Sequence, residues 1–146
     1  LAEGLIDTIG SDHAPHLLSE KDNKYCKAPS GLPTIQQSLP VLITIAAQED
    51  IPLTRIASVF SEKASELYGL NTGKIAKGYA ADLVIFDRNK EFTVKAEDIK
   101  SKCGWSPVEG HTVRWAVKHT LCNGMHIYNN GVFDPQSQGE EIRFCH

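Results

Sequence analysis

The spacing of apolar residues changes near Gly73, and this change constrains the fold more than any other feature of the sequence. Before it, apolar residues recur at steps of three and four, as on one face of a helix. They are Leu32, Ile35, Leu39, Leu42, Ile43 and Ala46. After it, residues 113–118 alternate apolar with mostly polar side chains, which is typical of a strand with one buried face. The sequence therefore predicts an α/β protein, with helices before the change and strands after it.

Proline, hydroxyl and glycine positions refine the helical prediction. Pro33 suits the first turn of a helix, and Pro40 interrupts the apolar pattern and should kink it. Thr54 can cap a short helix, and Ser61 can cap a second one that ends at Gly69. These helices are predicted to pack rather than to carry chemistry.

The strand predictions rest on short apolar runs and on two turn signals. Residues 8–11 and the mostly apolar residues 82–86 each predict a strand, the second of them mostly buried. Asn123-Gly124 and Asn130-Gly131 predict two-residue hairpin turns, because both central positions of such a turn need positive φ. The chain is therefore expected to close with a β-meander.

Composition narrows the class of ligand. The chain has 146 residues, of which 41% are hydrophobic, so it is long enough for one domain with a core. Its 15 basic and 18 acidic residues give a net charge of -3 without long runs of one sign, which indicates neither nucleic acid nor an anionic membrane as partner. No apolar run approaches the roughly 20 residues that span a bilayer, and the first ten residues lack signal-peptide features. We expect a soluble, cytoplasmic protein with a small-molecule ligand.

The four cysteines are predicted to be reduced. Cys26, Cys103, Cys122 and Cys145 form no Cys-x-x-Cys pair and have no histidine spacing typical of a zinc knuckle. Packing as small hydrophobic side chains accounts for most of them. Cys26 lies in the polar loop of residues 19–31 and is the one cysteine with a plausible place near a site.

The stretch IGSDHAPH, residues 9–16, concentrates polar chemistry directly after a predicted strand. Asp12 stands where α/β barrels and open α/β sheets place reactive groups. Carboxylate oxygen and imidazole nitrogen both suit Zn²⁺, and a carboxylate beside a metal-bound water can take its proton. The spacing alone also allows a structural interpretation, in which Asp12 caps the loop and His13 and His16 bond to backbone.

IGSDHAPH resembles the signature at the end of the eighth barrel strand in the dihydroorotases of the amidohydrolase superfamily. Other segments resemble that family in the same order, and they are Glu20-Lys21, residues 28–33, 53–58, 73–84 and 106–110. The segment at 73–84 is shared by many amidohydrolases. The DHAPH stretch is more specific, because hydantoinases and allantoinases usually diverge after the Asp-His pair.

The resemblance implies a fold and a site. Residues 1–72 would be the last strand, active-site loop and helices of a TIM-like (β/α)8 barrel, and residues 73–146 part of a small β-sandwich. Asp12 would be the last metal ligand and the catalytic acid and base beside a pair of zinc ions. The substrate contacts would be His16, Ser30 and Gly31, with glycine allowing close approach of the backbone. His13 would either fix the strand end by a hydrogen bond or orient Asp12 without itself binding the metal.

The resemblance also implies that the chain is a C-terminal fragment. The family's other metal ligands, a His-x-His pair, a carboxylated lysine and two further histidines, have no counterpart in this sequence. One carboxylate cannot hold a zinc pair, so the chain alone is expected to be inactive. The parent would interconvert N-carbamoyl-L-aspartate and dihydroorotate in pyrimidine biosynthesis, and it could form homo-oligomers. The alternatives are another cyclic amidohydrolase, acting on hydantoins, dihydropyrimidines or allantoin, and a non-catalytic dihydroorotase-like subunit.

The remaining histidines and the tryptophans are predicted to have structural roles. His111, His119 and His126 lie in the β-rich part, where surface or packing roles are expected. Trp105 and Trp115 are predicted to be core residues or hydrophobic cover.

Overall fold

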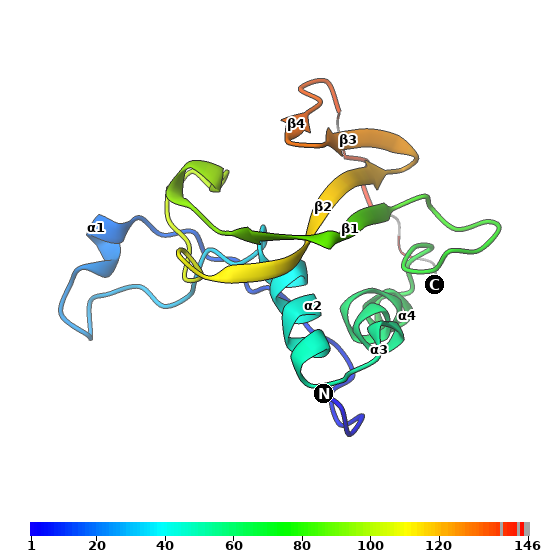
Figure 1. Cartoon of the computed structure of the whole chain (residues 1–146), viewed down its shortest axis with the longest axis horizontal. Coiled ribbons are helices and arrows are strands. Elements are labelled where there is room, and N and C mark those ends of the chain that lie inside the picture. The colour runs from blue at the N-terminus through cyan, green and yellow to red at the C-terminus, as the bar shows by residue number, and fades with distance from the viewer. Residues whose placement is uncertain (138, 143, 145–146) are drawn as a thin grey trace.

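The computed structural model describes residues 1–137, 139–142 and 144, and in them helices precede strands (Figure 1). The helical elements are α1 (Leu18–Lys21), α2 (Ser38–Gln48), α3 (Leu53–Ala57), the π-helical turn η1 (Ser58–Glu62) and α4 (Lys63–Leu67). The strands are β1 (Leu83–Thr93), β2 (Thr112–Cys122), β3 (Met125–Asn129) and β4 (Val132–Phe133), with a 3-10 helix, η2 (Ala96–Asp98), between the first two. The predicted change from helices to strands near Gly73 is confirmed.

The strands form one antiparallel sheet in the order β1-β2-β3-β4, which confirms the predicted meander. Cys122 pairs with Met125, so Asn123-Gly124 is a two-residue turn, and φ is 49° and 78° at its two positions. Asn130-Gly131 turns the chain between β3 and β4 in the same way, with φ of 46° and 98°. Both hairpin predictions are confirmed, because the left-handed conformation required at these positions is the one that asparagine and glycine adopt most readily.

β1 differs from its prediction in length and burial. It extends to Thr93, well beyond the predicted residues 82–86, and Val84 and Ile85 are 40% and 47% exposed rather than buried. The physical reason is its place at the edge of the sheet, with β2 as its single neighbouring strand. Among the described elements, α2 alone packs on the sheet, and it packs against β2 (Figure 1). The predicted segments 1–72 and 73–146 therefore touch, and their division into domains stays a prediction.

The predicted alternation of β2 holds only at its start. Val113 is buried and Arg114 exposed, but the pattern breaks at Trp115, whose φ is +61°, an unusual value for a bulky residue. The pairing of Asp87 with Ala116 and of Glu91 with Arg114 leaves three residues of β1 opposite Trp115. This bulge interrupts the alternation of faces, and the Arg88 guanidinium lies 4.8 Å from the centre of the Trp115 ring.

The helix predicted to start at Pro33 and to kink at Pro40 starts later. Thr34 O accepts hydrogen bonds from the N–H groups of Gln37 and Ser38 and closes a turn, and α2 begins at Ser38. Pro40 is the third residue of α2, where a backbone N–H has no partner within the helix. The kink prediction is therefore wrong, because proline at this position costs the helix no hydrogen bond.

The predicted caps at Thr54 and Ser61 are also wrong. α3, η1 and α4 follow one another without a break over residues 53–67, and both side chains lie inside this helical run. Its end agrees with the prediction, since Gly69 has φ of +63° and the Leu70 N–H donates to Ser65 O at 2.9 Å. This is the arrangement in which a glycine with positive φ ends a helix.

The helices bury a small core. Ala46 near the end of α2, Ile51 in the connection that follows it and Ile56 of α3 are buried together. Leu1, Leu39 and Leu42 pack against them. Val59 of η1 is fully buried, and its carbonyl accepts the N–H of Ile9 at 2.9 Å. That bond ties the segment leading to IGSDHAPH to the helices.

The structure does not form the strand predicted at residues 8–11. A strand needs a neighbouring backbone to pair with, and these residues are paired with none of β1–β4. The sole strand-like pairing nearby is an isolated parallel bridge between His13 and Leu32. The expected last barrel strand is therefore an extended segment in this structure.

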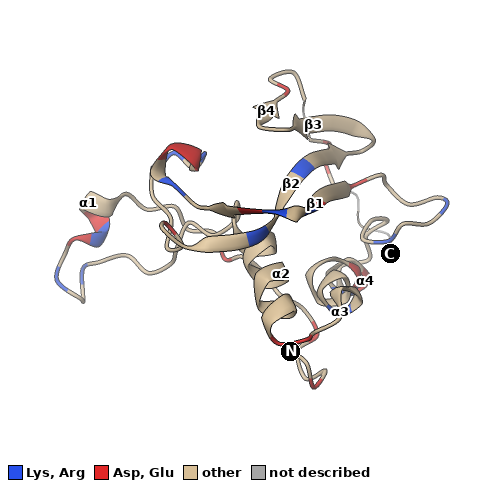
Figure 2. Cartoon of the chain, viewed as in Figure 1, with Lys and Arg blue, Asp and Glu red and all other residues tan. Residues whose placement is uncertain are grey.

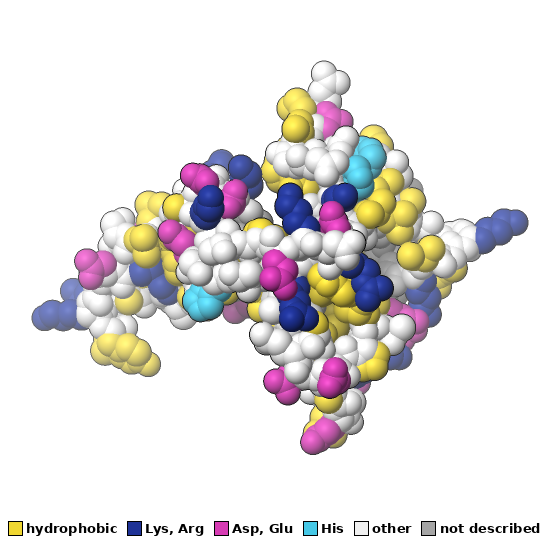
Figure 3. All heavy atoms as spheres, in the orientation of Figure 1, with side chains coloured by type: hydrophobic (Ala, Val, Ile, Leu, Met, Phe, Trp, Pro, Cys, Tyr) yellow, Lys and Arg dark blue, Asp and Glu magenta, His cyan; other side chains and the backbone are white. Residues whose placement is uncertain are grey.

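The surface is mixed in charge and in polarity. Lysine and arginine, and aspartate and glutamate, are scattered along the ribbon (Figure 2), and exposed hydrophobic side chains appear at several places on the face shown in Figure 3. Within the described residues, no helix has the length and apolar character needed to cross a membrane.

Candidate active site around Asp12

Asp12 is an exposed residue in a backbone turn that is fixed on both sides. Its φ is +44°, a left-handed conformation that aspartate tolerates better than most residues. Just before it, the Thr34 hydroxyl donates to Ser11 O at 2.6 Å, and just after it, the Ala14 N–H donates to Leu32 O at 3.0 Å. The carboxylate is thus presented to solvent from a backbone that the segment 32–34 holds in place.

His13 makes a hydrogen bond to backbone. Its Nδ1 accepts the Ile35 N–H at 3.3 Å, so a neutral His13 ring carries its proton on Nε2. The bond joins the Asp12 turn to the same neighbouring segment, next to the bridge with Leu32. A role in orienting Asp12 stays a prediction.

Gly31 is the point of closest approach between the two segments. Its φ is +94°, and a Cβ built on it would lie 2.4 Å from the Cβ of Ala14. Any side chain here would both strain the backbone and collide with the DHAPH loop. The sequence suggested that this glycine leaves room for a ligand, and the structure adds that it leaves room for Ala14.

Lys21 holds the chain around Ser30. Its half-buried ammonium donates to Pro29 O at 2.7 Å and to Gly31 O at 2.9 Å, the carbonyls on either side of Ser30. Sequence reasoning gave Lys21 no role beyond its place in a matching segment. Its acceptors lie eight and ten residues away, across a loop with no periodic pattern, so only the resemblance at Glu20-Lys21 could have drawn attention to it.

Both backbone polar groups of His16 are hydrogen-bonded, and its side chain is partly exposed. Its N–H donates to Ala14 O at 2.9 Å, and its carbonyl accepts the indole N–H of Trp105 at 2.8 Å. The imidazole Nδ1 lies 3.9 Å from a carboxylate oxygen of Glu20, and both side chains are substantially exposed. Trp105 is partly buried, and its indole N–H adds a hydrogen bond to the candidate site that the prediction of core or hydrophobic cover did not include.

The structure thus brings together residues 11–16 and 29–35, which contain all the predicted site residues. Asp12, His13, His16 and Gly31 lie on the two bonded segments, and Ser30 is exposed between the carbonyls that Lys21 binds. The roles predicted for these residues in catalysis and binding remain predictions.

The cysteines and the histidines of the sheet are not part of the candidate site. Cys26, Cys103 and Cys122 are free thiols, as predicted, and Cys145 is outside the described residues. Cys26 is exposed in the loop between α1 and Pro29. His119 of β2 and His126 of β3 stack with ring centres 5.1 Å apart.

The described residues do not form a metal site on their own. Nowhere among them do three or more histidine, cysteine, aspartate or glutamate side chains gather closely enough to hold a metal ion. A zinc pair therefore does not fit the donors of this chain alone, although Asp12 is accessible as one ligand.

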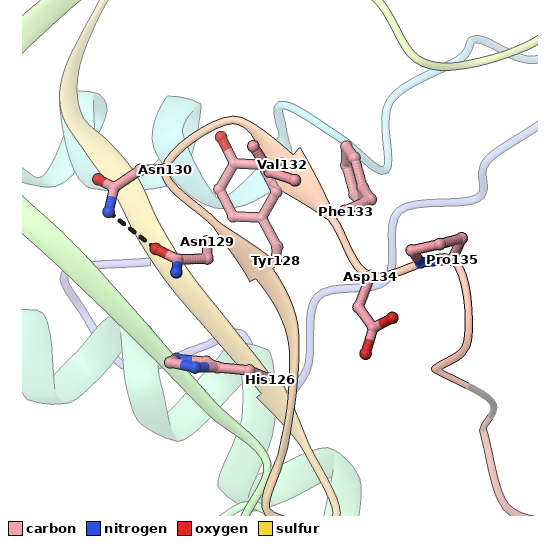
Figure 4. A pocket seen from close by; sticks show the side chains of 8 residues that line it. All are labelled: His126, Tyr128, Asn129, Asn130, Val132, Phe133, Asp134 and Pro135. Atoms are coloured by element: carbon pink, nitrogen blue, oxygen red, sulfur yellow. Dashed lines mark hydrogen bonds between the residues drawn. The ribbon is translucent and has the colours of Figure 1, made fainter.

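A hollow of about 600 Å³ lies on the β3–β4 hairpin rather than at Asp12. Figure 4 shows its lining, in which the rings of Tyr128 and Phe133 are tilted to each other with centres 5.0 Å apart, and the Asn130 side chain donates to that of Asn129. All of its lining residues come from residues 126–135, and none is a predicted site residue.

Residues 1–126 match the amidohydrolase family, and the chain belongs to this family. It is similar to dihydroorotases. It is 38% identical to that of Clostridioides difficile (strain 630), over 88% of this chain and 30% of the relative. It is also 38% identical to that of Halobacterium salinarum, over 76% of this chain and 26% of the relative. The chain thus spans less than a third of the length of these relatives.

Solved structures with a similar fold include hydantoinases. The D-hydantoinase from Thermus sp. superposes with a TM-score of 0.85 at 27% identity, over 91% of this chain and 30% of that one. The L-hydantoinase from Arthrobacter aurescens gives 0.84 at 31% identity, over 90% of this chain and 31% of that one. Their fold therefore contains the arrangement of helices and sheet described above.

Proposed function

We propose that this chain is the C-terminal part of a dihydroorotase, a hydrolase that opens and closes a cyclic amide. The observation that carries the proposal is the Asp12 turn, in which the backbone on both sides of an exposed carboxylate is hydrogen-bonded to Leu32 and Thr34. The 38% identity to dihydroorotases over most of the chain supports the same class. The hydantoinase-like fold supports a cyclic amidohydrolase in general. The choice of dihydroorotate as substrate rests on the loop at residues 9–16.

Each site residue has a proposed task. Asp12 would move a proton to and from the amide nitrogen of the ring, as an exposed carboxylate in a fixed position can. His16 would bind the substrate through its imidazole. The exposed backbone at Ser30 and Gly31 would face the ring, held there by Lys21.

Zinc is part of the proposal, with a limited contribution from this chain. Asp12 would supply one ligand, and the others would have to come from outside the described residues, because these form no metal-binding group. The 146 residues alone are therefore expected to show no turnover.

The proposed architecture follows from the family. Residues 1–72 would complete a (β/α)8 barrel, in which residues 8–11 find neighbouring strands, and residues 73–146 would belong to a β-sandwich. We also propose a cytoplasmic enzyme with a small-molecule substrate, and a homo-oligomeric state is compatible with it.

The test is a substrate panel with the full-length protein that the gene encodes. Dihydroorotate, hydantoin, dihydrouracil and allantoin are supplied in turn, and ring opening is followed by absorbance. We expect kcat/KM for dihydroorotate to exceed the others by at least about 100-fold, because a site built for a polar group rejects analogues that lack it. A higher kcat/KM for another ring would refute dihydroorotate as the substrate. No turnover of any of the four compounds would favour a non-catalytic subunit.

A further inference from the structure

The connection between β1 and β2 reaches from the sheet to the candidate site. The two ends of this connection, residues 94–111, are hydrogen-bonded to each other. The Val94 N–H donates to His111 O at 3.0 Å, and the Gly110 N–H donates to Val94 O at 2.8 Å. Val94 itself is buried. In Figure 1 this yellow-green connection lies on the same side of the molecule as the blue segment that carries α1. The connection is thus anchored in the sheet and extends toward the DHAPH loop.

Gln36 binds the connection near its middle. Its amide nitrogen donates to Asp98 O at 2.7 Å, and its amide oxygen accepts the Lys100 N–H at 2.8 Å. One planar amide group therefore makes two bonds to alternate residues of the connection. Because Gln36 directly follows the segment that holds the Asp12 turn, these bonds join the connection to the candidate site.

Trp105 makes the second contact, at His16. The indole N–H is the single donor of this side chain, and it is used on the His16 carbonyl at 2.8 Å. Ser106, the next residue, is buried, so the backbone that carries Trp105 has little freedom. The His16 N–H is already bonded to Ala14 O, so Trp105 fixes the remaining backbone group of His16.

We infer that Trp105 is a positioning residue for substrate binding, acting through His16. With both backbone groups of His16 held, its partly exposed imidazole can vary only by side-chain rotation. Without the indole bond, the His16 backbone would sample more conformations, and a ligand would have to restrict them on binding. Asp12 has separate contacts to residues 32–34, so its proton transfer does not depend on Trp105. This inference rests on the proposed function, because it takes His16 as a substrate contact.

The inference predicts a change in KM without a change in kcat. Trp105→Phe in the full-length protein keeps an aromatic ring for packing and removes the N–H. We expect KM for dihydroorotate to rise about tenfold, as for loss of one hydrogen bond, with kcat unchanged within about twofold. Trp115→Phe is the matched control, since Trp115 lies in the sheet bulge against Arg88, and its KM should not change. An unchanged KM in Trp105→Phe, or a fall in kcat alone, would refute the positioning role.

A second measurement separates this inference from the proposed function. Hydrogen exchange followed by mass spectrometry reports the protection of the peptide that contains residues 13–18, whatever the substrate is. We expect faster exchange there in Trp105→Phe than in Trp115→Phe. If the wild-type protein does not open dihydroorotate, the proposed function fails while this comparison still holds. Equal exchange in the two variants would overturn the role of Trp105 whatever the substrate.

Gln36→Glu provides a variant that leaves the indole in place. A carboxylate still accepts the Lys100 N–H but cannot donate to Asp98 O. We expect a smaller increase in KM in the same direction, with kcat again preserved. A larger effect on kcat than on KM would show that the connection acts on Asp12 and would contradict the inference.

Discussion

The candidate site segment, residues 9–36, and the sheet, residues 83–133, are held together in different ways. The sheet is closed by backbone ladders, which bulges interrupt, and by two local turns. The site segment is held by single bonds, most of them between a side chain and a distant backbone group. They come from Thr34, Lys21, Ile35, Gln36 and Trp105. Individual side chains therefore determine the geometry of the site, whereas the geometry of the sheet is spread over many equivalent bonds.

The two regions also differ in what they bury. Pro33 is the sole buried residue among residues 9–36, and the apolar side chains of Leu32 and Ile35 are 44% and 63% exposed. A segment with so few buried contacts belongs to the part of a protein that opens most easily. It is also a surface loop of the kind that carries binding and catalytic residues on a rigid scaffold. We therefore expect substitution of a single polar or glycine contact to lower stability more in the site segment than in the sheet.

The largest expected effect is at Gly31. Gly31→Ala adds a Cβ at 2.4 Å from the Ala14 Cβ in a residue with φ of +94°, so strain and collision together should cost about 3 kcal/mol. Gly78→Ala is the matched control, because φ is +90° there and nothing lies within 4 Å of the added Cβ. That variant should cost about 1 kcal/mol.

Urea unfolding of the full-length protein measures both variants. Equal losses of stability at the two glycines would show that the close approach of residues 31 and 14 is not a real constraint, and the comparison of the two regions would lose its clearest case.

The smallest expected effect is at an ion pair of the sheet. Two contacts lower the pKa of the Asp87 carboxyl below its ordinary value of 3.8. The larger cause is the hydrogen bond from the Asn89 N–H, and the second is the Lys118 ammonium, 3.1 Å from the carboxylate. A lowered pKa in the folded state stabilises the protein above the ordinary pKa, and this contribution disappears as pH falls through the folded pKa. Asp87→Asn should therefore lower Tm slightly at pH 7, and the difference from wild type should vanish as pH falls from about 5 to 2.

The Asp87 prediction also has a salt control. The pair is partly exposed, so 1 M salt should reduce the difference in Tm at pH 7. A large loss of Tm that persists at low pH would mean that a single polar contact matters in the sheet as much as in the site segment.

The parts of the structure that could be predicted from sequence are local. A two-residue hairpin turn depends only on the Asn-Gly pair and on the strand residues directly beside it. The hairpins at 123–124 and 130–131 were therefore predictable. Gly69 ended its helix for the same reason. The signature at residues 9–16 pointed to a candidate site, because its residue types and order resemble those of one family.

The parts that could not be predicted depend on distant partners. Trp105 and His16 are 89 residues apart, and no local pattern links an indole to that carbonyl. The bulge at Trp115 depends on the register of β1, and the exposure of Val84 and Ile85 depends on which strand lies at the edge. Residues 8–11 have the composition of a strand, but a strand forms only where another backbone pairs with it.

We propose that Asp12 performs the proton transfer of a cyclic amide hydrolase. Asp12→Asn in the full-length protein is the most direct measurement, because asparagine also tolerates positive φ and has the same size, so the backbone turn should be preserved. We predict that kcat for dihydroorotate falls by roughly 10³-fold, within the range of a lost acid or base, while the unfolding midpoint stays near that of wild type. Turnover within about tenfold of wild type would contradict the claim.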